Sequence, residues 1–109
     1  MARIVKWTET ASEDLREAAK FIARDSSYYA ASFVRQVRKA ALSLDHSSER
    51  GRIVPESERT DIREIYVKSY RLIYQVTPNN VFILAFIHGA RDLANILSHR
   101  DGCYHFNEG

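Results

Sequence analysis

Two arginines stand in the stretch SYRLIYQVTPNNVFILAFIHGARD, residues 69–92, where two strand-like runs flank a turn. Arg71 lies inside the first run, and Arg91 follows the second run after a glycine. A guanidinium group stays charged and grips phosphate through two parallel hydrogen bonds. His88, which precedes that glycine, could transfer a proton near neutral pH. The two arginines are therefore candidates for contact with a target, and His88 lies near Arg91 in the sequence.

The same three residues also have structural explanations. Arg71 could pair with Glu64 or Asp61 across a hairpin, because opposite charges on facing strands attract each other. Arg91 could cap a final helix, and His88 could be a hydrogen-bonded histidine at the end of a strand. Residue type and position alone leave both explanations open.

Metal binding has little support in the sequence. The tail carries His99, Cys103 and His105, which offer three ligands where a structural zinc site uses four. The single cysteine excludes an intrachain disulfide. The net charge of +2 and the pI near 8.8 are too mild to indicate a nucleic-acid surface. We expect neither a metal nor another cofactor.

Length and composition indicate one folded domain. The chain has 109 residues, of which 45% are hydrophobic and 28% are charged. No apolar run approaches the roughly 18 residues of a membrane helix, and the start MARIVKWTETASEDL lacks the apolar core of a secretion signal. We expect a cytoplasmic protein without membrane contact, with a domain over residues 1–97 and a polar tail over residues 98–109.

The first half of the chain predicts a strand followed by two helices. Residues 3–7 are rich in β-branched and aromatic side chains, which favours a strand. Thr8 or Thr10 can cap the first helix, and Thr10 with Glu13 fits a capping box. Residues 26–27, Ser-Ser, can cap the second helix. Apolar residues recur every three or four positions at Trp7, Ala11, Leu15, Ala18 and Ile22, and again at Tyr29, Phe33, Val37, Ala40 or Ala41, and Leu44.

The second half predicts three strands and a short helix. The strands cover residues 61–67, 70–76 and 81–87, joined by short turns that require antiparallel pairing. The last run is apolar throughout, which is typical of a central strand covered on both faces. Residues 45–61 read as an irregular loop, and residues 91–97 as a short C-terminal helix. The fold class is therefore α+β, a two-layer sandwich in β-α-α-β-β-β order, with a mostly antiparallel sheet packed by a helical hairpin.

This element order, together with four motifs, resembles the RelE/ParE superfamily of toxins from bacterial type II toxin–antitoxin pairs. The motifs are GRIVPE at residues 51–56, IREI at 62–65, YRLIY at 70–74 and HGARD at 88–92. The resemblance implies a cognate antitoxin that folds onto grooves between the helical hairpin and the sheet. It also implies that the complex contacts operator DNA through the antitoxin.

Two activities occur among members of this superfamily. RelE-like members cut mRNA on the ribosome without a metal, and a ribonuclease of that kind would use Arg71, Arg91 and His88 as catalytic residues, with Glu64 as a possible base. ParE-like members instead block DNA gyrase. The chain lacks the lysine pair of the RelE-like enzymes and has Leu97 where they carry a tyrosine. These departures favour a ParE-like toxin, with the ribonuclease as the alternative.

Overall fold

The computed structural model describes residues 2–55, 57 and 59–89. The predicted helix over residues 91–97, Arg91 and the tail lie outside these residues. The elements are, in order, β1 (Ile4–Trp7), α1 (Glu9–Ala23), α2 (Ser27–Leu42), the 3-10 helix η1 (Ser43–Asp45), β2 (Arg52–Ile53), β3 (Ile62–Val67), β4 (Tyr70–Val76) and β5 (Asn80–His88).

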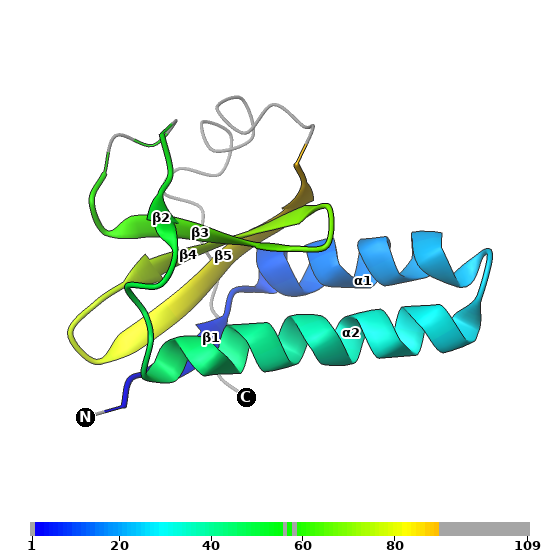
Figure 1. The fold of residues 1–109 in the computed structure, drawn as a ribbon, viewed down its shortest axis with the longest axis horizontal. Coiled ribbons are helices and arrows are strands. Elements are labelled where there is room, and N and C mark those ends of the chain that lie inside the picture. Colours follow the sequence, from blue (N-terminus) through cyan, green and yellow to red (C-terminus); the bar gives the residue numbers. More distant parts are fainter. Residues whose placement is uncertain (1, 56, 58, 90–109) are drawn as a thin grey trace.

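The five strands form one sheet in the order β1-β5-β4-β3-β2. Strand β1 pairs with β5 in parallel, and every other pairing is antiparallel. The helices α1 and α2 form a hairpin that covers one face of the sheet (Figure 1). This arrangement confirms the predicted α+β sandwich and its order of elements. Within the described residues, no helix is long and apolar enough to cross a membrane.

The segment over residues 45–61 is more ordered than predicted. It contains β2, whose Arg52 and Ile53 pair with Glu64 and Arg63 of β3. A strand of two residues is too short to leave an alternating pattern in the sequence. The prediction of an irregular loop was therefore wrong at this point.

Both helices begin at side-chain caps. The Thr8 hydroxyl accepts a hydrogen bond from the Ala11 amide at 3.1 Å, and the Ser26 hydroxyl accepts one from the Tyr29 amide at 3.1 Å. The alternative start at Thr10 was wrong, because α1 already begins at Glu9. Tyr29 was also wrongly placed in the buried stripe of α2: it is 70% exposed, and Ala30 takes the inward position.

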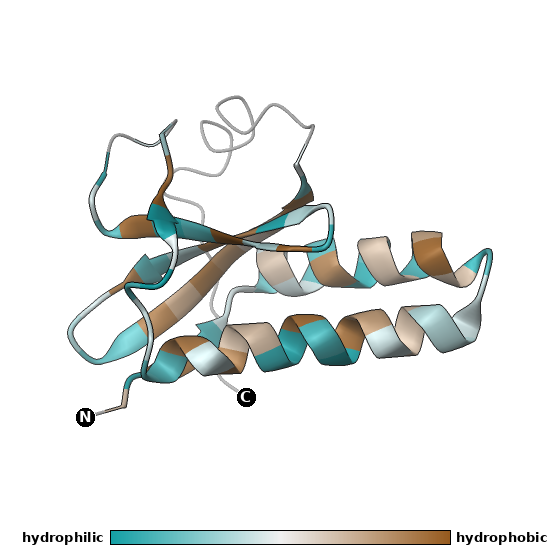
Figure 2. Ribbon diagram, viewed as in Figure 1, coloured by the Kyte–Doolittle hydropathy of each residue, from teal (hydrophilic) through white to brown (hydrophobic). Residues whose placement is uncertain are grey.

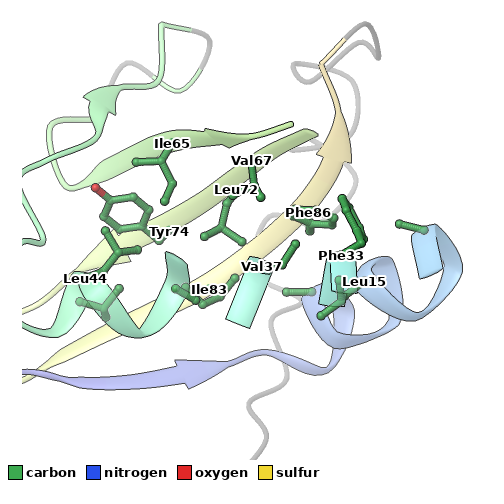
Figure 3. Close-up of a cluster of buried hydrophobic side chains, with 14 residues drawn as sticks. Leu15, Phe33, Val37, Leu44, Ile65, Val67, Leu72, Tyr74, Ile83 and Phe86 are labelled. Carbon is green, nitrogen blue, oxygen red and sulfur yellow. The ribbon is translucent and has the colours of Figure 1, made fainter. Parts of the chain in front are cut away.

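The main core lies between the helical hairpin and the sheet, as Figure 3 shows. Beside the core, the partly buried Tyr70 stacks on Phe86 with ring centroids 4.9 Å apart, and Phe33 packs against both rings at 5.4 and 5.8 Å. The cluster includes Ala11, Leu15, Ala18, Phe33, Val37, Ala41, Leu44, Ile65, Val67, Leu72, Tyr74, Val81, Ile83 and Phe86.

Strand β5 is buried on both faces, and a bulge interrupts its register. Ile73 pairs with Ala85 and Tyr74 pairs with Ile83, so Leu84 is an extra residue in the ladder. Consequently Ile83 packs in the core beneath the helices, while Leu84 and Ala85 pack in a second cluster on the opposite face. The strand is hydrophobic along most of its length (Figure 2). This confirms the prediction of a central strand with two covered faces.

Candidate functional site

Three charged residues meet on the sheet face opposite the helices. The Arg71 Nε and Nη2 atoms each lie 2.5 Å from Glu64 Oε1, and Arg52 Nε lies 2.5 Å from Glu64 Oε2. Glu64 on β3 is 1% exposed and Arg71 on β4 is 4% exposed. Arg52 on β2 keeps most of its side chain in solvent. One buried carboxylate thus receives hydrogen bonds from one buried and one exposed guanidinium.

This cluster confirms the predicted pairing of Arg71 with Glu64. Asp61, the other predicted partner, instead accepts hydrogen bonds from Arg59 at 2.7 and 3.0 Å and from Gln75 at 2.9 Å. Burial strengthens the attraction between Arg71 and Glu64 because little water screens their charges. The Arg71 guanidinium is therefore buried and ion-paired, and does not face solvent as a phosphate-binding group would.

His88 lies on the other side of the sheet from Arg71. Tyr70 pairs with His88 and Arg71 pairs with Ile87, and successive residues of a strand point to opposite faces. The His88 ring is exposed and stands edge-on to the Tyr70 ring, with centroids 5.4 Å apart. The structure does not bring the Arg71 and His88 side chains together, and Arg91 lies outside the described residues. Their catalytic roles stay predictions.

Tyr74 holds the segment before β2 against the sheet. Its hydroxyl accepts a hydrogen bond from the Gly51 amide at 2.9 Å and donates one to the Ser48 carbonyl at 2.8 Å. Burial raises the pKa of Tyr74 above its ordinary value of 10.0. A Cβ atom on Gly51 would lie 2.4 Å from the Tyr74 oxygen and 2.5 Å from the Glu64 carbonyl oxygen. Glycine is therefore required here for close packing, a role that sequence reasoning missed.

Two grooves open between the helical hairpin and the sheet. The first, here called the β1 groove, has a volume of about 1020 Å³ and runs beside residues 4–7. The second, here called the aromatic groove, has a volume of about 430 Å³. Phe21 and Tyr29 line the aromatic groove and are 64% and 70% exposed, and Phe33, Lys68, Tyr70 and His88 also border it. Exposed aromatic side chains around a groove are typical of surfaces that bind proteins.

The described part of the chain contains no group of three or more histidine, cysteine, aspartate or glutamate residues arranged to hold a metal ion. The tail residues His99, Cys103 and His105 lie outside it.

Comparison with known proteins identifies a family and a related fold. The family model described as the ParE toxin of type II toxin–antitoxin system, parDE, matches residues 5–93. A solved structure titled "Chromosomal ParDE TA system from P. aeruginosa" is 19% identical in sequence, with a TM-score of 0.67. The alignment covers 80% of this chain and 96% of that chain, which shows a shared fold. Among curated protein sequences, none matches this chain.

Proposed function

Because this chain belongs to the ParE toxin family of type II toxin–antitoxin systems, we propose that it stops growth by binding and poisoning DNA gyrase. A cognate antitoxin neutralises it, and the pair contacts operator DNA through the antitoxin. The toxin acts in the cytoplasm, where gyrase is found. The observation that carries this proposal is the family match over residues 5–93.

The geometry supports a protein that binds its target over one that cuts RNA. A metal-free ribonuclease needs cations and proton-transfer groups that converge on one phosphate. Here the Arg71 guanidinium is buried and ion-paired with Glu64, and His88 points to the opposite face of the sheet. The exposed aromatic groove, in contrast, suits contact with another protein.

The test combines purified toxin with purified gyrase and relaxed plasmid. We expect supercoiling to fall as toxin is added, and gyrase-linked broken DNA to accumulate. In cells that produce the toxin alone, pulse labelling should show DNA synthesis failing before protein synthesis. Coexpression of the cognate antitoxin should restore growth.

Full supercoiling at saturating, folded toxin would overturn the gyrase assignment. Early collapse of protein synthesis with cleaved mRNA would favour the ribonuclease alternative. In that case the variants Arg71→Ala, Arg91→Ala and His88→Ala would identify the groups that support cleavage.

A further inference from the structure

A polar pocket opens where the chain passes from η1 to β2, at one end of the sheet (Figure 1). This pocket, here called the loop pocket, has a volume of about 520 Å³, within the roughly 300–1,000 Å³ typical of ligand sites. Apolar residues help to line the β1 groove and the aromatic groove, whereas the described lining of the loop pocket is polar throughout. A ligand of the loop pocket is therefore polar. The lining consists of Arg3, His46, Ser47, Ser48, Glu49 and Arg50.

The two arginines of this lining donate hydrogen bonds to neutral oxygen atoms. Arg3 donates through Nε to the Thr77 carbonyl at 2.8 Å and through Nη1 to the Ser48 hydroxyl at 3.1 Å. Arg50 donates through Nη1 to the Ser43 hydroxyl at 3.1 Å. Neither arginine forms an ion pair with a carboxylate of the described residues. Because a guanidinium carries five N–H donors, both side chains keep donors and positive charge for a ligand.

The loop that carries the pocket is held in place from the sheet. The Tyr74 hydroxyl donates to the Ser48 carbonyl at 2.8 Å, and Arg63 Nη1 donates to the Gly51 carbonyl at 2.8 Å. Arg63 therefore adds a third positive charge next to the loop. A pocket that is formed before the ligand arrives loses little conformational entropy on binding.

The charge balance of the loop pocket differs from that of the cluster around Glu64. There, Arg52 and Arg71 share one carboxylate. In the described lining of the loop pocket Glu49 is the one carboxylate, and no described arginine forms an ion pair with it. Positive charge therefore exceeds negative charge here, which favours an anion. Phosphate suits such a site, because the planar donors of arginine match its oxygen atoms.

We propose that the loop pocket binds a phosphate group through Arg3 and Arg50. Two sources share this chemistry, the backbone of DNA and a small free phosphoanion. Phosphate binding as such does not depend on the action on gyrase. A DNA source rests on that proposed function, because gyrase holds DNA while the toxin acts on it.

The first test titrates inorganic phosphate into ¹⁵N-labelled toxin at constant ionic strength, with chloride as the reference anion. We expect saturable shifts in the backbone amide signals of residues 46–50 and in the Nε signal of Arg3. Arg50→Gln should weaken phosphate binding about 10-fold, because it removes a charge-assisted donor. Arg50→Lys keeps the charge without the planar fork and should weaken binding less than Arg50→Gln does.

The matched control is Arg35→Gln, which removes the same charge from an exposed position of α2 outside the lining of the loop pocket. It should leave the dissociation constant for phosphate within about 2-fold, because screened charges outside a contact contribute little. Arg50 is exposed, and its side chain donates to the Ser43 hydroxyl alone, so we expect the Arg50 variants to fold.

The second test distinguishes the two sources of phosphate. A short DNA duplex should compete with inorganic phosphate for the same signals, and its affinity should fall as salt is added. Arg50→Gln should reduce the slope of that salt dependence by about 1, the change expected for one lost phosphate contact. Phosphate shifts that the duplex does not displace would keep the site and assign it to a free phosphoanion.

Two results would overturn phosphate binding at the loop pocket. One is the absence of saturable shifts in folded toxin, and the other is equal phosphate affinity in the wild type and in Arg50→Gln. The supercoiling assay separates this inference from the proposed function. Inhibited supercoiling without phosphate shifts would remove the site and keep the gyrase assignment, whereas full supercoiling with intact shifts would do the reverse.

Discussion

Both faces of the sheet bury side chains, but the two faces are held by different interactions. The face beneath the helices is packed with apolar side chains such as Leu72 and Phe86, and the Tyr74 hydroxyl lies at its margin (Figure 3). The opposite face also has an apolar cluster, yet it encloses the charged pair of Glu64 and Arg71. The stability of an apolar face depends on how completely its side chains fill the space. The stability of a buried charge depends on its oppositely charged partner. The two faces should therefore respond differently to loss of a side chain.

The largest effect is expected from Glu64→Ala. This change leaves the buried Arg71 guanidinium without its carboxylate, and breaking a buried pair in this way costs roughly 3–5 kcal/mol. Chemical denaturation should show this loss in the free energy of unfolding. Arg52→Ala is the control, because Arg52 touches the same carboxylate from a side chain that is 61% exposed, and it should cost under about 1 kcal/mol. Equal costs for the two variants would show that burial does not distinguish the two arginines.

On the apolar face, Leu72→Ala should cost about 3 kcal/mol, since it removes a fully buried side chain and leaves a cavity. Leu72→Met keeps most of the volume and should cost under about 1.5 kcal/mol. Both losses in the free energy of unfolding should be measured by denaturant unfolding at one pH. A Met variant as unstable as the Ala variant would mean that shape, more than volume, controls this face.

At the margin of the apolar face, Tyr74→Phe should cost about 2 kcal/mol. It keeps the ring and removes the partner of the Gly51 amide and the Ser48 carbonyl, and leaving buried polar groups unsatisfied costs roughly 1–3 kcal/mol. Hydrogen exchange should also accelerate at the Gly51 amide. Unchanged exchange there would show that the segment before β2 is held by other contacts.

The smallest effect is expected at the exposed pair of Arg59 and Asp61. This pair is the solvent-exposed comparison for the buried pair of Glu64 and Arg71. The hydrogen bond from Arg59, with a second from Gln75, holds the pKa of Asp61 below its ordinary 3.8. Because the folded-state pKa is the lower one, the stabilisation is present above about pH 4 and is lost as pH falls through the folded-state value. Asp61→Asn should cost under about 1 kcal/mol at pH 7 and nothing at low pH. A loss of stability in Asp61→Asn that persists at low pH would show that the Asp61 side chain contributes through packing.

Local features of the fold were readable from the sequence. Strand β4 has the predicted bounds, and Ser26 caps α2, because turns and caps depend on residues that are neighbours in the chain. The pairing of Glu64 with Arg71 was also among the predicted alternatives. In the hairpin Arg71 lies opposite Tyr66, and Glu64 is its diagonal neighbour on the same face.

Periodicity, caps and turns in the sequence therefore determined β1, both helices and strands β3 to β5 with their order, and the motifs pointed to the family. Only the tertiary structure decided how distant segments meet. It placed β1 parallel to β5, it put the extra residue Leu84 into the ladder, and it set Gly51 against Tyr74. It also separated Arg71 from His88 by the thickness of the sheet. The pairing of β1 with β5 and the contact of Gly51 with Tyr74 join segments that are far apart in sequence. The bulge and the separation of Arg71 from His88 depend on the register of β4 with β5, in which a shift of one residue moves a side chain to the other face.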